Sequence, residues 1–274
     1  MQIIESNLRG KQMDQALCED GLFVNENFVA IIDGVTSKGH QLWNGLTSGN
    51  YAKNLICKEL ALISPDISAK DLLFRLNSLL LESYLRDIEK DAIEEWLRAC
   101  IIIYSEHYKE IWSYGDCQCM INQHYYPNDK KIDAVNSESR SLALNYALLN
   151  GATIPQLQKE DVGREMILPF LKLQLSFENQ CTEFGYPVLN GHTLNLEYLK
   201  IYQVKHKDTV ILASDGYPAL MPTLSESEAK LCWLIENDPL CFQVYKSTKG
   251  LVCGNYSFDD RCYCRFVVML YHFS

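Results

Sequence analysis

The sequence predicts an α+β fold, a four-layer α-β-β-α sandwich in which two mainly antiparallel sheets are flanked by helices. Short apolar segments typical of β-strands occur near the start, the middle and the end of the chain. Pairs of segments with helical spacing lie between these strand groups, one pair early and one pair late. Because strands and helices do not alternate one by one, the pattern favours packed antiparallel sheets over a parallel βαβ sheet.

The chain is long enough for one large domain. It has 274 residues, of which 47% are hydrophobic and 22% are charged. These fractions are ordinary for a globular protein and allow a sizeable core. No Pro/Gly/Ser-rich linker, repeat or low-complexity tract divides the sequence. We therefore expect a single domain over residues 1–274.

A hairpin and two helices are the first predicted elements. Leu22–Val24 and Phe28–Ile32 are expected to form two strands joined by a polar turn at residues 25–27. Apolar residues then recur at helical spacing on both sides of a break near Pro65. They are Ala52, Leu55, Ile56 and Leu60, followed by Leu72, Leu73, Leu76, Leu79, Leu80 and Tyr84. Asp66 or Ser68 is a suitable cap for the second helix.

The second half of the chain contains most of the predicted strands. A meander is expected over Cys100–Tyr104, Lys109–Tyr114 and Cys117–Asn122, with Gly115-Asp116 as the tight connection between the last two. Residues 137–180 have a helical and irregular pattern. Further strands are predicted near residues 186–190, 197–204 and 209–213, helices near 223–236 and 238–246, and a last strand over 262–272. Thr223 or Ser225 would cap the first of these helices.

Acidic residues stand at the ends of four of these apolar segments. The four signals are Glu19-Asp20, Asp33-Gly34, Asp215-Gly216 and Asp259-Asp260. If the strand ends converge, several carboxylates share one small volume, where like charges raise one another's pKa and oppose folding unless a cation is present. Oxygen ligands without a nearby Cys/His cluster suit a hard divalent ion. The sequence therefore predicts a Mg²⁺ or Mn²⁺ site.

Charge and cysteine content exclude several classes of function. A formal net charge of −10 leaves no basic stripe for a nucleic-acid backbone. No apolar run is long enough to span a bilayer, and the first residues lack the pattern of a signal peptide. The eleven cysteines are odd in number and lack the Cys-x₂₋₄-Cys spacing of zinc sites. We expect a cytoplasmic protein without a nucleic-acid or membrane partner.

Five short motifs together resemble those of the metal-dependent protein phosphatases of type 2C, in particular their divergent bacterial-type members. In chain order these motifs are Glu19-Asp20, Asp33-Gly34, Gly115-Asp116, Ser214-Asp215-Gly216 and Asp259-Asp260. Each dipeptide alone is a weak signal, but the order and spacing of all five agree with the family pattern over roughly residues 8–270.

The resemblance implies a site for two divalent ions, Mn²⁺ or Mg²⁺, with Asp33 and Asp215 as the catalytic residues. Asp33 would bridge the two ions, and the carbonyl of Gly34 would complete the ligands of one. Glu19 would serve that same ion, directly or through water, with Asp20 beside it. Two such ions activate a water for in-line attack on phosphorus.

The remaining acids are implied to hold the second ion and a possible third one. Asp215 and Asp259 would hold the second ion. The choice between Asp259 and Asp260 stays open, because a shift of one residue exchanges their roles. Asp116 matches the position that some members use for a third metal, although Ala219 stands where a further acid is usual.

Two departures concern substrate binding and proton transfer. Gln15 stands where family members often have an arginine that grips phosphate, and Arg9 or Lys11 would have to replace it. Val35 stands where many members have a histidine as general acid. The nearby candidates for that role are Thr36, Ser37 and His40.

The resemblance implies hydrolysis of phosphoserine or phosphothreonine on a phosphorylated protein. The departures leave open a catalytically weak phosphatase-like binding module or sensor. A third alternative is an enzyme for small phosphomonoesters. Residues 150–180 fall where the family has a variable flap, and we expect them to set substrate choice.

Overall fold

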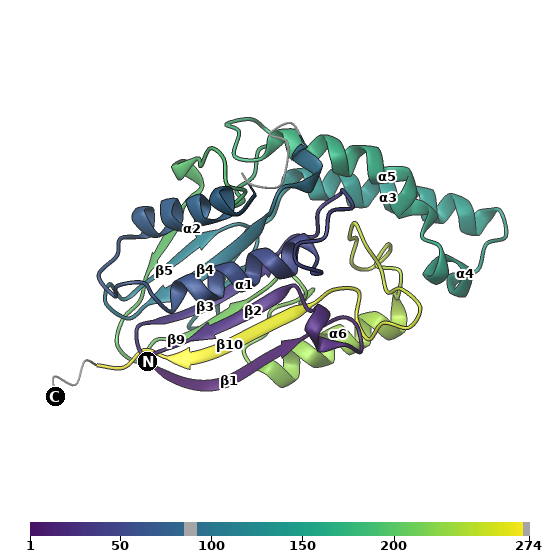
Figure 1. Cartoon of the computed structure of the whole chain (residues 1–274). Coiled ribbons are helices and arrows are strands. Elements are labelled where there is room, and N and C mark those ends of the chain that lie inside the picture. The colour runs from purple at the N-terminus through teal and green to yellow at the C-terminus, as the bar shows by residue number, and fades with distance from the viewer. Residues whose placement is uncertain (85–91, 271–274) are drawn as a thin grey trace.

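Two five-stranded antiparallel sheets form the centre of the protein (Figure 1). The structure is a computed structural model that describes residues 1–84 and 92–270. One sheet, here called the β3 sheet, has the order β2 (Asp20–Val24), β3 (Phe28–Gly34), β4 (Ala99–Ser105), β5 (Glu110–Tyr114) and β8 (Lys200–Gln203). The other, the β10 sheet, has the order β1 (Gln2–Arg9), β10 (Arg261–Val267), β9 (Thr209–Ala213), β6 (Gln118–Ile121) and β7 (His124–Tyr126). The predicted α+β class with two antiparallel sheets is confirmed.

The two sheets pack face to face around one apolar layer. Alternate residues of β3 and β4 point into this layer and meet alternate residues of β6, β9 and β10. The buried side chains include Val29, Ile31, Ile102, Cys119, Leu212, Cys264 and Phe266. All eleven cysteines are free thiols, and those on the strands fill space in the core.

Helices cover the outer faces of both sheets (Figure 1). Helices α1 (Ser48–Leu60) and α2 (Ala69–Tyr84) lie on the β3 sheet and bury most of the apolar residues whose spacing predicts them, from Ala52 to Leu80. Helix α6 (Leu224–Asn237) lies along the β10 sheet, where Leu224 packs on a cluster around Ile211 and Tyr263. Thr223 caps α6 in a capping box with Glu226. Both predicted helix pairs therefore have at least one member in place.

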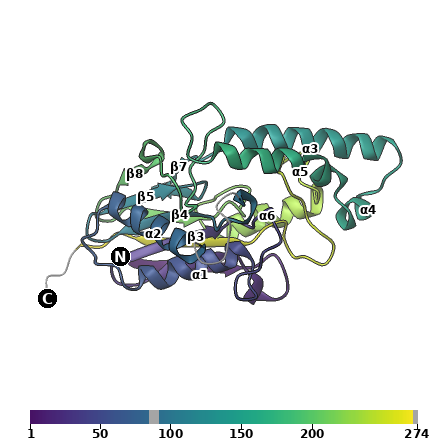
Figure 2. The ribbon, with the colours of Figure 1, turned by 45° about the horizontal axis from the view of Figure 1, so that its top comes forward.

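A helical hairpin projects beyond the sheets (Figure 2). Helices α3 (Lys131–Leu149) and α5 (Val162–Leu173) run side by side, and the short helix α4 (Ile154–Lys159) lies at their far end. We call α3, α4 and α5 the flap helices. They confirm the predicted helical character of residues 137–180, although the first helix begins earlier, at Lys131. No helix in the described part of the chain is both long and apolar enough to cross a bilayer.

The predicted meander is wrong in one respect. Strand β6 pairs with β9 and β7 in the β10 sheet, and not with β5. Gly115-Asp116 therefore carries the chain from one sheet to the other and closes no hairpin. Gly115 has φ 125°, and an added Cβ would lie 2.3 Å from the Cβ of Cys100. The crossing needs glycine because a side chain has neither the conformation nor the space.

Three further predictions differ from the structure. Residues 238–246 form no helix, because the Asp238 carboxylate accepts the backbone N–H groups of residues 242–245 and holds them in a loop. Residues 186–190 form only isolated bridges, at Tyr186 and Leu189. Strand β10 ends at Val267, and residues 271–272 of the predicted last strand lie outside the described residues.

Candidate active site

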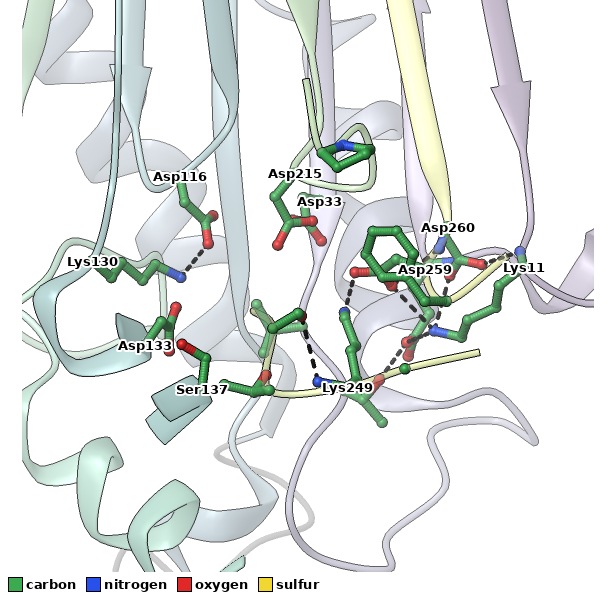
Figure 3. A pocket seen from close by; sticks show the side chains of 18 of the residues that line it. Lys11, Asp33, Asp116, Lys130, Asp133, Ser137, Asp215, Lys249, Asp259 and Asp260 are labelled. Atoms are coloured by element: carbon green, nitrogen blue, oxygen red, sulfur yellow. Dashed lines mark hydrogen bonds and ion pairs between the residues drawn. The ribbon is translucent and has the colours of Figure 1, made fainter. Parts of the chain in front are cut away.

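The acidic motifs meet at one end of the two sheets (Figure 3). Asp20 begins β2 and lies opposite Asp33, near the end of β3, in antiparallel register. Asp116 follows β5, Asp215 follows β9, and Asp259 precedes β10. All five line one cavity of about 1100 Å³, whose wall also includes residues of the flap helices such as Asp133 and Arg164. The predicted convergence of distant carboxylates is therefore observed.

Asp33 and Asp215 have no cationic partner among the described residues. Burial raises the pKa of Asp33 well above its usual range, and the neighbouring charges of Asp215 and Asp20 raise it further. Burial and the charge of Asp259 raise the pKa of Asp215 to about 7, against the opposing effect of Lys249. Neither carboxylate is therefore neutralised by an ion pair with a described residue.

Glu19 is held by hydroxyl groups at the edge of the cavity. Thr47, the N-cap of α1, donates to its Oε1 at 2.6 Å, and Thr36 donates to its Oε2. The ammonium of Lys11 lies 3.7 Å from the same Oε2. Glu19 therefore has partners for both carboxylate oxygens.

The backbone around Gly34 depends on a close approach of two glycines. An added Cβ on Gly34 would lie 2.2 Å from the carbonyl oxygen of Gly49. An added Cβ on Gly49 would lie 2.4 Å from the Gly34 carbonyl oxygen and 2.7 Å from Glu19 Oε1. Helix α1 can therefore pack against the end of β3 only without side chains at these positions.

We expect Gly49→Ala to destabilise the protein by about 1–3 kcal/mol, the usual cost of overpacking. This exceeds the gain of up to about 1 kcal/mol that alanine brings to a helix. Urea unfolding measures the change, and Lys58→Ala, at an exposed position of the same helix, is the control. A Gly49→Ala protein as stable as that control would contradict the close approach.

The two acids before β10 have different partners. Both oxygens of Asp260 accept backbone N–H groups, from Lys11 at 2.7 Å and from Glu19 at 3.0 Å. The ammonium of Lys11 also lies 3.4 Å from Oδ2 of Asp260. Asp259 forms ion pairs with Lys249 through Oδ2 and with Lys11 at 3.6 Å through Oδ1. Asp260 therefore fixes the backbone, and Asp259 carries its charge toward two ammonium groups.

Asp116 also has a lysine partner. Its Oδ2 lies 2.5 Å from the ammonium of Lys130, and this neighbour holds the pKa of Asp116 below its usual range although burial acts in the opposite direction. Its Oδ1 is buried without a hydrogen-bond partner, as is Oδ2 of Asp20. An orphaned buried carboxylate oxygen is costly unless a donor or a cation completes it.

Lys11 is the basic residue of the N-terminal segment that reaches the cavity. Gln15 is exposed and accepts the N–H of Gly10 at 2.7 Å, so its amide shapes the loop. Arg9 lies over the ring of Tyr256, 5.4 Å from the ring centroid. Of the two predicted replacements for the phosphate-gripping arginine, only Lys11 lines the cavity.

Thr36 and Ser37 line the cavity next to Val35. His40 is exposed and does not line it. Ala219 is likewise absent from the cavity wall. Of the three candidates for the role of general acid, Thr36 and Ser37 therefore line the cavity and His40 does not.

The sequence motifs do not predict the other basic residues that line the cavity. They are Lys38, Lys130, Arg164, Lys246 and Lys249. Burial, together with the charges of Arg164 and Lys249, lowers the pKa of Lys38 to about 7. No motif in the sequence marks these residues, since they are isolated cations in loops and in the flap helices.

The donor set fits a hard divalent cation in part. Asp20, Asp33 and Asp215 offer oxygen ligands. Oδ2 of Asp20 has no hydrogen-bond partner, and Asp33 and Asp215 form no ion pair with a described residue. Yet no three Asp, Glu, His or Cys side chains within residues 1–84 and 92–270 are close enough to form a complete metal centre. Asp259 fits worst, because both of its oxygens face lysines.

The packed sheets, outer helices and acidic strand ends define the fold of the type 2C protein phosphatases. Among solved structures with this fold, the serine/threonine phosphatase Stp1 from Staphylococcus aureus matches with a TM-score of 0.50 and 14% identity, over 98% of this chain and 96% of Stp1. The Mycobacterium tuberculosis serine/threonine phosphatase PstP/Ppp gives a TM-score of 0.49 and 16% identity, over 97% of this chain and 98% of that chain. At such identities the likeness establishes the fold alone.

The sequence itself has no detectable relatives in two comparisons. No model of a known protein family matches the chain, and no curated protein matches it.

Proposed function

We propose that this protein is a divergent type 2C phosphatase that uses Mn²⁺ or Mg²⁺ to hydrolyse phosphoserine or phosphothreonine on a protein. The observation that carries the proposal is the pairing of Asp33 and Asp215, two half-buried carboxylates from different sheets that share a cavity and form no ion pair within the described residues. The fold, with its acidic strand ends, supports the same activity.

Different residues of the cavity would bind the ion and attract the substrate. Asp20, Asp33, Asp215 and the carbonyl of Gly34 are the candidate ligands of a divalent ion. Such an ion, when bound, activates water for attack on phosphorus and neutralises phosphoryl charge. Lys11, beside Asp259, and Lys38 and Arg164 also line the cavity and attract a phosphate dianion into a protein of net charge −10.

The test is release of phosphate from a phosphoserine or phosphothreonine peptide. We expect turnover with Mn²⁺ or Mg²⁺ and its loss in excess EDTA, with recovery when the metal is restored. A generic aryl phosphate and small phosphomonoesters serve as comparison substrates. Metal-dependent turnover of small phosphomonoesters but not of phosphopeptides would refute the protein substrate and leave a small-molecule phosphatase.

Mn²⁺ should also stabilise the fold, because it relieves the repulsion among Asp20, Asp33 and Asp215. A ligand at about 100 times its Kd contributes about 2.7 kcal/mol, which raises the Tm of a protein of this size by roughly 5–10 °C. Thermal unfolding in MnCl₂ against EDTA measures this shift. An unchanged Tm at millimolar Mn²⁺ would count against a metal site.

A second candidate function is a phosphatase-like module that binds a phosphoprotein without turnover. The ion pairs of Asp259 with Lys249 and of Asp116 with Lys130 favour it, because they withdraw two acids from metal binding. Phosphopeptide binding in calorimetry without phosphate release would support the module. The cytoplasmic location and the lack of nucleic-acid and membrane partners stay predictions from the sequence.

A further inference from the structure

Lys249 is a cation built into the acidic end of the cavity. Its ammonium forms an ion pair with Oδ2 of Asp259, whose side chain is 9% exposed. Lys11 lies 3.6 Å from the other oxygen. Figure 3 shows the Lys249 side chain reaching from a loop opposite the strand ends toward Asp259. Both oxygens of this carboxylate therefore face positive charge.

The loop that carries Lys249 is fixed by the flap helices. We define it as residues 238–250, the Lys249 loop. Arg140 of α3, which is fully buried, donates to the carbonyl oxygens of Cys241 at 3.2 Å and Ser247 at 2.9 Å. Arg164 of α5 donates at 2.7 Å to the carbonyl oxygen of the residue before Lys249. The backbone of Lys249 is thus held in place, unlike that of an ordinary surface lysine.

A second feature fixes the same loop. Gly250, the residue after Lys249, packs so closely that an added Cβ would lie 2.6 Å from the carbonyl oxygen of Leu240. At the start of the loop, the Asp238 carboxylate accepts several backbone N–H groups. An ammonium on such a scaffold meets its carboxylate at a small entropic cost.

Three other acids of the cavity lack this neutralisation. Asp33 and Asp215 form no ion pair within the described part of the chain, and Oδ2 of Asp20 has no hydrogen-bond partner. Asp259 is therefore matched by a resident cation, as Asp116 is by Lys130, whereas Asp20, Asp33 and Asp215 are not. A divalent ion placed at Asp259 would stand against a fixed ammonium of the same sign.

We propose that the Lys249 ammonium takes the place of one divalent ion, so that Lys249 neutralises Asp259 and the cavity binds a single metal ion, on the side of Asp20, Asp33 and Asp215. This inference rests on the proposed phosphatase function, from which the need for a metal comes. It departs from the two-ion site that the family resemblance implies. Lys249 acts as a positioning residue for the charge balance of the site.

Calorimetric titration with MnCl₂ alone tests the proposal without any measurement of turnover. The wild-type protein is expected to bind one ion. Lys249→Met, which keeps length but removes the charge, is expected to bind a second ion or to bind Mn²⁺ roughly tenfold more tightly, as the loss of one nearby unit charge implies. Lys249→Arg restores the charge and should return the wild-type stoichiometry.

Lys246→Met is the matched control, because Lys246 lies on the same loop but forms its ion pair with Glu138 of α3. It should titrate like the wild type, and circular dichroism checks that each variant is folded. Two ions bound with Lys249 intact, or identical titrations of Lys249→Met and the wild type, would overturn the inference and leave the phosphatase proposal standing. No Mn²⁺ bound by any variant would overturn both.

Discussion

Asp33→Asn is expected to lower phosphopeptide turnover by roughly 10³-fold, because the divalent ion loses a charged ligand worth several kcal/mol of transition-state stabilisation. The substitution keeps the size of the side chain. It removes one charge from the pair that Asp33 forms with Asp215. Steady-state assays in saturating Mn²⁺ measure the loss.

Asp129→Asn is the control for this experiment. Asp129 is an exposed residue of the same cavity, and its substitution removes the same charge as Asp33→Asn does. Its turnover should stay near that of the wild type. In EDTA, Asp33→Asn should also unfold at a higher temperature than the wild type, because a like-charge repulsion is gone. Turnover of Asp33→Asn within tenfold of the wild type would refute the assigned role.

The acidic end of the cavity could be predicted because it depends on local signals. Each acid stands directly beside a strand whose apolar pattern is clear, as Asp33 does after residues 28–32. A two-sheet fold allows few arrangements of such strands, so the carboxylates at their ends lie close together. The order of the motifs was therefore enough to predict which acidic residues meet in the cavity.

The local sequence does not distinguish the true conformation of the elements that were missed or wrongly predicted. Strand β1 is an edge strand with mostly exposed side chains, and its pairing with β10 rests on the backbone. The crossing at Gly115-Asp116 has the same residues as a hairpin turn. Residues 238–246 have helical spacing, but Asp238 captures their N–H groups. In each case a tertiary or side-chain interaction decides between conformations that the local sequence allows.

Lys249 illustrates why the cations of the site could not be foreseen. Its neighbours in sequence, in a loop without regular structure, give no hint of its partner. Its approach to Asp259 depends on Arg140 and Arg164, which lie on the flap helices about a hundred residues earlier. The acidic motifs lie at the ends of strands, whereas Lys249 lies on a loop that the flap helices hold.

Arg140→Met is therefore expected to destabilise the fold and to loosen the Lys249 loop that carries Lys249 toward Asp259. Arg140 is fully buried and forms an ion pair with Asp161 at 2.6 Å in addition to its two carbonyl partners in the Lys249 loop. Methionine fills a similar volume but leaves these acceptors without donors. Removing one partner of a buried ion pair costs about 3–5 kcal/mol, and Asp161 is 20% exposed, so we expect the lower end.

Urea unfolding measures this loss, and Arg75→Met is the matched control. Arg75 pairs with Glu59 on the surface, with its own side chain 56% exposed, and such a pair contributes under about 1 kcal/mol. Hydrogen exchange of residues 241–250 should rise in Arg140→Met, because the loop loses its buried anchor while Arg164 alone still holds it. If Arg140→Met matched Arg75→Met in stability and left exchange in the Lys249 loop unchanged, the loop would not depend on the flap helices for its position, and the fixed backbone assigned to Lys249 would be wrong.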